Sequence, residues 1–219
     1  MERIPEPEIM DDPKQALAYA RADFAEVNAA FVERLRAALG EEPVRRIVDL
    51  GCGPADIPLR IARLLPAVAL TAVDASAPML ALAREAVRAG GFRSRIALVR
   101  ASVPALPLKA GAFDVIVSNS LLHHLREPRS FWREVARLGQ SGGLVLVVDL
   151  LRPETPARAR EIVEREAGGE EPVLQRDFYN SLLAAFTPAE VRGQLDAGLS
   201  HLDCRPVSDR HWMVCGRIP

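Results

Sequence analysis

The chain of 219 residues is long enough to bury one hydrophobic core, and its 28 basic and 29 acidic side chains nearly cancel. This balance gives no reason to expect a nucleic acid or an anionic membrane surface as a partner, because both attract basic proteins. Three widely spaced cysteines argue against a disulfide scaffold and against zinc bound by paired cysteines, so no metal site is expected. The sequence shows neither a signal-peptide pattern nor an apolar run of about eighteen residues, so we expect a cytoplasmic protein.

The N-terminal region begins with an acidic pair followed by proline, a pattern that predicts the start of a helix. Apolar side chains then recur at steps of three and four residues as far as Gly40, which predicts one continuous helix. We expect residues 1–40 to form a lid over the ligand edge of the core, or else a contact in a homodimer. Tyr19, Asp23 and Asn28 could face a ligand from this helix, and the alternative is that they face solvent.

The middle of the chain alternates apolar runs with helical patterns. Near-continuous apolar strands joined by helical crossovers are typical of a parallel sheet covered on both faces. In such sheets ligands bind at the carboxyl ends of the strands. The expected strands cover residues 45–50, 68–73, 96–99, 113–117 and 144–150, and the expected helices cover 56–65, 76–89 and 127–138.

The C-terminal third has a different pattern. Residues 151–186 are charged and rich in proline, with short helices expected at 156–166 and 177–186. We interpret this segment as a substrate cap, because long connections that carry short helices usually cover a site. A capping box at Thr187 predicts the last helix, and a hairpin follows with strands at 199–205 and 211–216. Four residues here are candidates for orienting a substrate, each with an ordinary structural role as its alternative: Arg152, Arg176, Tyr179 and His211.

The first strand ends at two glycines spaced one residue apart, and a helical pattern starts at once. This arrangement lets the backbone approach a nucleotide-like ligand closely. A dinucleotide fingerprint requires another glycine at position 56, where this chain has Asp56. S-adenosylmethionine carries no pyrophosphate, and it requires only the close backbone approach and an acid at the end of the second strand. Asp74 stands at that place and can accept two hydroxyl donors.

Several motifs in this order resemble those of the class I S-adenosylmethionine-dependent methyltransferases, in the group that acts on small molecules. The resemblance covers about residues 44–150. It implies a doubly wound α/β sheet of seven strands, in the order 3-2-1-4-5-7-6 with strand seven antiparallel. Together with the pattern of the remaining chain, it leads us to expect one domain over 1–219, with a cofactor-binding core at 44–150, the cap at 151–186, and the last helix and hairpin at 187–219. The motifs are Val48-Asp49-Leu50-Gly51-Cys52-Gly53-Pro54, Val73-Asp74-Ala75-Ser76-Ala77-Pro78-Met79-Leu80, Leu106-Pro107-Leu108, Phe113-Asp114-Val115-Ile116-Val117-Ser118-Asn119, Leu122-His123-His124-Leu125 and Gly142-Gly143.

The resemblance also implies roles for individual residues. Gly51 and Gly53 would line the methionine portion of S-adenosylmethionine, while Asp49 would hold the turn or the amino group. Asp74 would bind the ribose. The remaining members of the expected cofactor set are Ala75 and Met79 beside the adenine, Ser102 and Val103 at the adenine edge, and Cys52 and Asn119 within the matching motifs.

Two positions depart from the family pattern. Ala55 stands where the family often has a third glycine, which narrows the turn slightly. Ser102 replaces an acidic residue that reads the adenine edge, so we expect a neutral hydrogen bond there in place of a charged one. The alternative is that Ser102 is an ordinary turn residue.

The expected function is in-line transfer of a methyl group from S-adenosylmethionine to a small-molecule acceptor. A base is needed only if the acceptor arrives protonated, and His123 and His124 are the candidates, with packing as the alternative role. A catalytically silent S-adenosylmethionine-binding subunit that regulates a partner protein would show the same cofactor motifs. Asp56 argues against a nicotinamide oxidoreductase.

Overall fold

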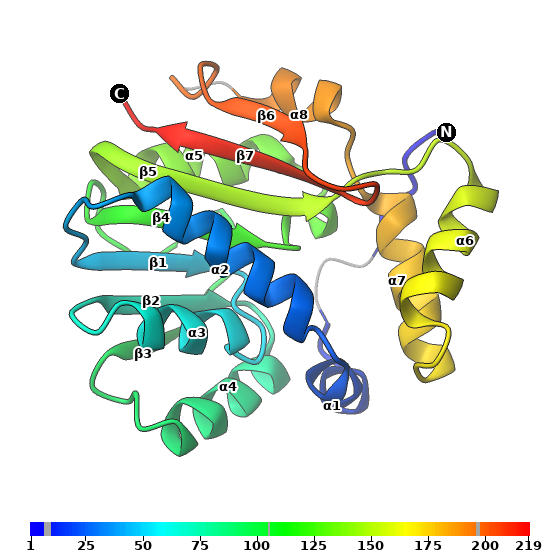
Figure 1. Cartoon of the computed structure of the whole chain (residues 1–219), viewed down its shortest axis with the longest axis horizontal. Helices are drawn as coiled ribbons and strands as arrows, with labels where there is room; N and C mark the ends of the chain where they lie inside the picture. The colour runs from blue at the N-terminus through cyan, green and yellow to red at the C-terminus, as the bar shows by residue number, and fades with distance from the viewer. Residues whose placement is uncertain (7–9, 105, 196–197) are drawn as a thin grey trace.

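The computed structural model describes residues 1–219 except 7–9, 105 and 196–197 (Figure 1). Seven strands of these residues form one sheet in the order β3-β2-β1-β4-β5-β7-β6. Neighbours among β1 to β5 pair in parallel, whereas β7 pairs antiparallel with β5 and β6. The predicted strand order and the antiparallel seventh strand are therefore confirmed. The strands are β1 (Arg46–Leu50), β2 (Ala69–Asp74), β3 (Ile96–Arg100), β4 (Phe113–Asn119), β5 (Gly139–Leu150), β6 (Asp203–Pro206) and β7 (His211–Arg217).

Helices cover both faces of the sheet, with α2, α3 and α4 on one face and α5 and α8 on the other (Figure 1). No helix in the described ranges combines the length and the apolar character that crossing a bilayer requires. The helices are α1 (Pro13–Arg21), α2 (Ala25–Leu39), α3 (Asp56–Leu64), α4 (Ala77–Ala89), the 3₁₀ helix η1 (Leu122–His124), α5 (Pro128–Leu138), α6 (Pro156–Ala167), α7 (Pro172–Ala184) and α8 (Pro188–Gln194).

The central strands are buried on both faces. Ile47 belongs to the hydrophobic core under α2 to α4, and the next residue, Val48, belongs to the core under α5 and α8. Side chains alternate between the faces of a strand, so a strand covered on both sides must be apolar at nearly every position. The near-continuous apolar runs of the sequence are explained by this burial. A third, smaller core joins α6 and α7 to Leu150 at the end of β5.

The N-terminal helix differs from the prediction, because two helices replace the continuous one. Ala22 adopts an extended conformation that ends α1, and the Asp23 carboxylate accepts a hydrogen bond from the Ala25 N–H (2.9 Å) at the start of α2. A short acidic side chain that binds nearby backbone favours a helix start over a helix interior. The rings of Tyr19 and Phe24 pack across the break, with centroids 4.7 Å apart. The apolar periodicity continues across the break and therefore hid it.

Boundaries in the C-terminal third also differ from the prediction. Helix α7 begins at Pro172, five residues before the predicted start at 177, because proline is well suited to the first helical position. Strand β5 begins at Gly139, and β6 is confined to Asp203–Pro206. The capping box at Thr187 is present as predicted. That last helix ends at Gln194 and not near 198 as predicted, because Leu195 leaves the helical conformation and caps it with its N–H bonded to the Val191 carbonyl.

The parallel strands all point toward one edge, where α1, α6 and α7 lie (Figure 1). Helix α1 contacts both α4 and α7, and α7 also contacts η1. The carboxyl ends of the strands are thus surrounded by elements from both ends of the chain.

Candidate active site

The turn between β1 and α3 has left-handed backbone at Gly51 (φ +79°), Gly53 (φ +51°) and Ala55 (φ +71°). The N–H groups of Gly51 and Cys52 donate to the Val73 carbonyl at 2.8 and 2.9 Å, which fastens the turn to the end of β2. A Cβ on Gly51 would lie 2.9 Å from the Cβ of Leu121. A Cβ on Gly53 would meet no atom within 4 Å. Packing therefore requires the first glycine, whereas the second leaves the backbone open to a ligand.

Asp74 at the end of β2 links the turn after β1 to the start of α4. Its Oδ2 accepts the Gly53 N–H at 2.8 Å, and its Oδ1 accepts the Ser76 N–H at 2.9 Å. Burial raises the pKa of the Asp74 carboxyl, although these N–H donors partly offset the effect. Each carboxylate oxygen keeps a further lone pair for a donor on a ligand.

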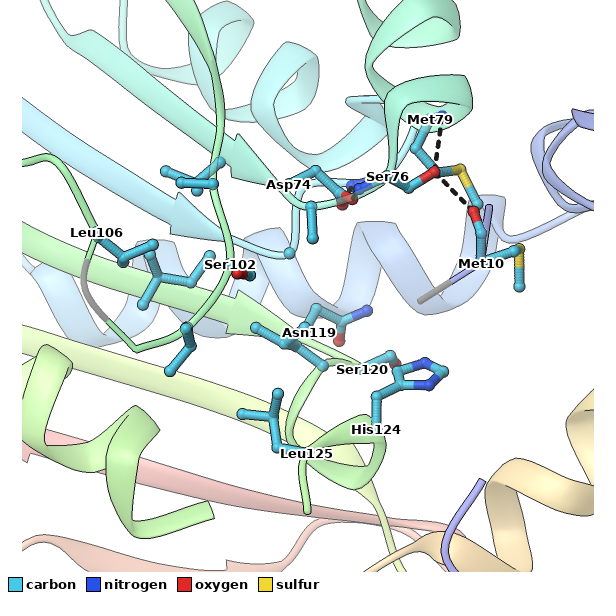
Figure 2. A pocket seen from close by; sticks show the side chains of 18 of the residues that line it. Met10, Asp74, Ser76, Met79, Ser102, Leu106, Asn119, Ser120, His124 and Leu125 are labelled. Carbon is cyan, nitrogen blue, oxygen red and sulfur yellow. Dashed lines mark hydrogen bonds between the residues drawn. The ribbon is translucent and has the colours of Figure 1, made fainter. Parts of the chain in front are cut away.

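The larger of two neighbouring cavities opens between this turn and η1 and has about 1060 Å³ of empty space, its opening to solvent included. Figure 2 shows Asp74 and Met79 on one side of it and Asn119 and His124 on the opposite side. The cavity brings together ten residues predicted from the sequence: Tyr19, Gly51, Gly53, Asp74, Ala75, Met79, Ser102, Val103, Asn119 and His124.

The second cavity, about 740 Å³ on the same measure, adjoins the first and has a more charged lining. Four residues line both cavities: Tyr19, Gly51, Gly53 and Asn119. The second cavity is further lined by Asp23, Asn28, Cys52, Asp56 and Arg60. The Asp56 Oδ2 accepts the Arg60 Nε–H at 2.6 Å and the Asn28 side-chain amide at 2.8 Å. This cavity thus offers a cation, carboxylates and an amide within one small space.

Two buried groups between the cavities are suited to a polar ligand. The Asn119 Oδ1 is buried and accepts no hydrogen bond from any residue that the structure describes. Since an unpartnered buried acceptor costs free energy, it fits a ligand that brings a donor. Burial and the charges of Asp74 and Asp149 raise the pKa of Tyr19 to about 12. Tyr19 therefore presents a neutral phenol at this point.

Asp49 lies behind the turn, with 2% of its surface exposed, and lines neither cavity. Burial and the neighbouring Asp74 raise its pKa to about 8, so this carboxyl is neutral at pH 7 in the folded chain. Of the predicted cofactor residues, Asp49 thus lies behind the residues that line the cavities, and Cys52 lines only the second cavity.

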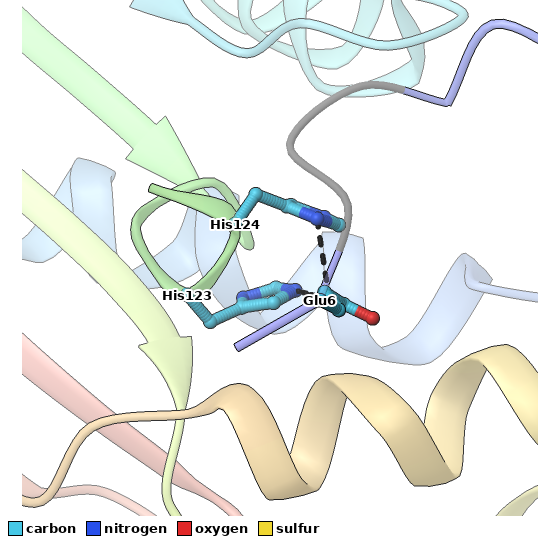
Figure 3. Close-up of side chains that lie close together, drawn as sticks. All are labelled: Glu6, His123 and His124. Atoms are coloured by element: carbon cyan, nitrogen blue, oxygen red, sulfur yellow. Dashed lines mark ion pairs between the residues drawn. The ribbon is translucent and has the colours of Figure 1, made fainter. Parts of the chain in front are cut away.

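The two histidines of η1 occupy different environments. His124 lines the larger cavity, whereas His123 is buried, with 2% of its surface exposed. The His123 Nδ1 lies 2.5 Å from the Asp149 Oδ1. Burial opposes protonation of His123, but Asp149 and Glu6 outweigh it and raise the pKa. Both rings face the Glu6 Oε1, at 3.5 Å from the His123 Nε2 and 3.2 Å from the His124 Nδ1 (Figure 3).

The four candidates for orienting a substrate line neither cavity. The Arg152 guanidinium donates to the Ala185 carbonyl (3.0 Å) and to the Glu190 carboxylate (2.7 Å), and it thereby links the residues after α7 to α8. The side chain of Arg176 is 68% exposed. Tyr179 packs in the core of α6 and α7, beneath the guanidinium of Arg160. The His211 Nδ1 lies 3.0 Å from the Ser208 Oγ, and burial together with Arg210 lowers its pKa to about 4. These placements support structural roles in place of the predicted ones.

Other residues at this edge were missed by the sequence analysis. Met10 lines the larger cavity, and its carbonyl accepts the Ser76 hydroxyl at 2.6 Å. Nothing in the sequence near Met10 or Glu6 indicates a site. Asp149 ends an apolar strand just as Asp74 does, so this acid could have been found by the same reasoning. Leu121 and Leu125 add an apolar wall next to His124.

Comparison with known proteins gives matches to methyltransferases. Residues 48–147 match the family described as "Methyltransferase domain". Malonyl-[acyl-carrier protein] O-methyltransferase of Legionella pneumophila is 34% identical over 111 residues, which are 51% of this chain and 38% of that protein. Demethylmenaquinone methyltransferase of Thermus thermophilus is 30% identical over 125 residues, 57% of this chain and 55% of that protein. The match thus spans about half of these relatives or less.

Solved structures share the fold over nearly the whole chain. A SAM-dependent methyltransferase from Aquifex aeolicus superposes with a TM-score of 0.69 at 16% identity, covering 95% of this chain and 99% of that one. The [4+2]-cyclase SpnF superposes with a TM-score of 0.63 at 17% identity, covering 100% of this chain and 89% of that one. Proteins of more than one activity therefore have this fold. The matched residues 48–147 contain the strands and helices that enclose most of the larger cavity, and over this segment the chain is similar to methyltransferase domains.

Proposed function

We propose that this protein transfers a methyl group from S-adenosylmethionine to a small-molecule acceptor. One observation carries the proposal. The glycine turn and Asp74 form one wall of the larger cavity, and His124 lies on the opposite wall (Figure 2). A donor and an acceptor bound between these walls would be held next to one another, and such alignment supplies a large part of the rate enhancement in bimolecular displacement.

The nucleoside part of the cofactor fits the larger cavity. Asp74 would accept the ribose hydroxyls with the lone pairs that Gly53 and Ser76 leave unused. The adenine would lie between Ala75 and Met79, with Ser102 and Val103 at its edge. Ser102 is exposed and lines the cavity, so its hydroxyl can serve as a neutral hydrogen-bonding group there.

The amino-acid part fits the second cavity. Its ammonium and carboxylate groups are opposite in charge, and Asp56 and Arg60 supply complementary charges there. The unpartnered Asn119 Oδ1 would accept a donor at the junction of the two cavities. Tyr19, which lines both, can donate from its neutral phenol.

S-adenosylmethionine supplies, when bound, a methyl group on a sulfonium that already leaves readily. The protein then needs to exclude water and to orient the acceptor. Leu121 and Leu125 give the acceptor side an apolar wall, and His124 is the ionisable group on that side. His124 would accept a proton from an acceptor that arrives protonated, with the Glu6 carboxylate orienting its ring. His123, buried behind it, would position η1.

The acceptor is proposed to be a small molecule, and residues 1–40 are proposed to act as a lid. The names of two relatives indicate a malonyl group on a carrier protein and a demethylated quinone as their substrates. An apolar cavity wall with one imidazole is consistent with an acceptor that has an apolar body and one nucleophilic atom. The proposal of a lid is supported by Met10 and Tyr19, two residues of the N-terminal region that line the larger cavity.

Two measurements test the proposal. Calorimetry with S-adenosylhomocysteine tests the cofactor site, and formation of that product from S-adenosylmethionine tests turnover in the presence of quinols, phenols and amines. We expect binding together with turnover of at least one of these acceptors. Binding without turnover of any acceptor would favour the silent subunit. Absence of binding would contradict both alternatives.

A further inference from the structure

We propose that Glu6, His123 and His124 form a binding site for a divalent transition-metal ion of the Zn²⁺ type. Each residue offers one ligand atom, and the three atoms lie within 4.8 Å of one another. The donors come from two segments that are far apart in the sequence, so no local motif of ligand residues indicated them. Figure 3 shows both imidazole rings on the same side of η1, facing the Glu6 carboxylate.

The distances suit a tetrahedral ion. With ligand bonds of about 2.0–2.1 Å, the edge of a tetrahedron around Zn²⁺ is about 3.3 Å. The His124 Nδ1 and the His123 Nε2 lie 3.2 and 3.5 Å from the Glu6 Oε1, on either side of this value. The longer distance exceeds the ordinary range of an N–H···O hydrogen bond, about 2.7–3.2 Å. The His123 nitrogen thus lies too far from Glu6 for an ordinary hydrogen bond, and both nitrogen–oxygen distances suit two ligands of one tetrahedral ion.

The two rings are also arranged as a pair. Their centroids are 4.1 Å apart and the planes are tilted by 36°. Two protonated imidazoles at this separation would repel each other. An ion bound through the lone pairs of two neutral rings removes that repulsion, because metal ligation requires the unprotonated nitrogen.

The surroundings of these ligands resemble a metal site with supporting hydrogen bonds. The His123 Nδ1 faces Asp149, which leaves its Nε2 for the ion. Asp149 is itself fixed by the N–H groups of Leu122 and Leu150, both at 2.6 Å. The Ser181 hydroxyl donates to the Glu6 Oε1 at 2.9 Å. A carboxylate that orients a ligating histidine in this way is a common feature of zinc sites.

The charges suit a divalent ion. Glu6 and Asp149 together supply two negative charges, which offset those of the ion. The nearby Arg3 guanidinium is directed to the carbonyls of Ala184, His123 and Leu125 and stacks on Phe186, so it does not occupy the space between the ligands. Two imidazoles and one carboxylate favour zinc or cobalt over magnesium and calcium, which prefer oxygen ligands.

Three protein ligands leave one position of a tetrahedral ion open, as in catalytic zinc sites. Of the three ligands, His124 lines the larger cavity. The ion would therefore lie at the wall of the cavity. With the ion bound, the His124 Nδ1 is one of its ligands. An oxygen or sulfur atom of the acceptor that bound to the ion would lose its proton more readily than in the free acceptor.

The test uses the full chain without an affinity tag, stripped of metal with a chelator and titrated without cofactor. Co²⁺ is followed by visible absorption and Zn²⁺ by calorimetry. We expect one ion per chain and the absorption of tetrahedral cobalt. The variants E6Q and H124N should each weaken Co²⁺ binding at least tenfold. The variant D149N, which alters the support of His123 and of the Leu122 and Leu150 N–H groups but removes no ligand, should weaken it about 10- to 100-fold. Circular dichroism checks that each variant is folded.

His201 is the matched control, because it is an exposed histidine whose Nε2 lies 2.7 Å from the Arg217 carbonyl, on another part of the surface. H201N should bind Co²⁺ as the parent does. The proposal is overturned if the parent chain binds no cobalt, or if E6Q and H124N bind it unchanged. Since the titration contains neither cofactor nor acceptor, its outcome is independent of the proposed methyl transfer. Calorimetry of E6Q with S-adenosylhomocysteine separates loss of the metal from loss of the cofactor site.

Discussion

Asp74 accepts a hydrogen bond from the Gly53 N–H across 2.8 Å, and this contact links the two sequence motifs that define the larger cavity. The acid ends β2, and the glycine lies in the turn after β1. A change at Asp74 therefore acts on the cofactor and on the turn that faces it.

Replacement of Asp74 by alanine should weaken binding of S-adenosylhomocysteine by about 1.5–3 kcal/mol, the range for a hydrogen bond to a charged group. This corresponds to roughly a 10- to 150-fold rise in Kd, measured by calorimetry. Asp74→Asn keeps one carbonyl oxygen and should lose less. Asp203→Ala on β6 serves as the control, since it removes another aspartate side chain, which lines neither cavity. An unchanged Kd for Asp74→Ala would remove the ribose assignment.

The two glycines of the turn should differ in their effect on stability. Alanine at either position adopts a left-handed conformation that costs about 1–2 kcal/mol. Alanine at Gly51 also meets Leu121 at 2.9 Å, and such overpacking costs about 1–3 kcal/mol more. Urea unfolding should therefore rank Gly51→Ala below Gly53→Ala in free energy of unfolding. Gly169→Ala, which meets no atom within 4 Å, is the control. Equal losses at the two turn positions would contradict the packing argument.

The sheet and the glycine turn could be predicted because short stretches of sequence carry them. A strand buried on both faces is apolar throughout, and a turn that needs left-handed backbone is marked by glycine. The same reasoning placed Asp74 at the right edge, because the carboxyl ends of parallel strands meet there. It failed at Ala22 and Asp23, where one polar side chain ends the helix without interrupting its apolar pattern.

The contacts around η1 could not be predicted, because they join segments far apart in the chain. Glu6 meets His123 and His124 only after the N-terminal residues pass over the edge of the sheet. Charged residues of the predicted cap, 151–186, were proposed to orient a substrate, and their contacts could not be predicted for a related reason. Arg152 looks available in the sequence, but folding directs it to Ala185 and Glu190.

A pH dependence of stability should arise from Asp49. Its pKa is about 8 in the folded chain, because of burial and the nearby Asp74, and roughly 3.9 when unfolded. Between these values the folded chain keeps a proton that the unfolded chain has lost. Stability from this group is therefore full below the unfolded pKa and falls as pH rises toward 8, by at most about 1.4 kcal/mol per pH unit.

The variant Asp49→Asn removes this titration while keeping the shape of the side chain. Urea unfolding at pH 5, 6, 7 and 8 should show the variant gaining stability relative to the parent as pH rises. Asp203→Asn, whose side chain is 58% exposed, should follow the parent at every pH. Parallel curves for Asp49→Asn and the parent would show that Asp49 does not hold a proton in the folded chain.

The N-terminal strap, which we define as residues 1–6 and 10–12, is held at the edge of the sheet by Arg3. Its guanidinium donates to the carbonyls of Ala184 (2.6 Å), His123 (2.8 Å) and Leu125 (3.1 Å), and it lies 4.1 Å from the centre of the Phe186 ring. The next residue of the strap, Ile4, donates its N–H to the Leu183 carbonyl at 3.0 Å. Arg3 thus joins the strap to the end of α7 and to η1.

Replacement of Arg3 by alanine should release the strap without unfolding the core, because it removes hydrogen bonds worth about 1.5–3 kcal/mol at one surface. Hydrogen exchange at the Ile4 amide should become at least tenfold faster, whereas amides in β1 and β4 keep their protection. If the strap acts as a lid, S-adenosylhomocysteine should also dissociate faster. Arg36→Ala, an exposed arginine paired with Glu33 on α2, is the matched control and should change neither rate. Unchanged exchange at Ile4 would show that other contacts hold the strap, and unchanged dissociation with fast exchange would separate the strap from any role as a lid.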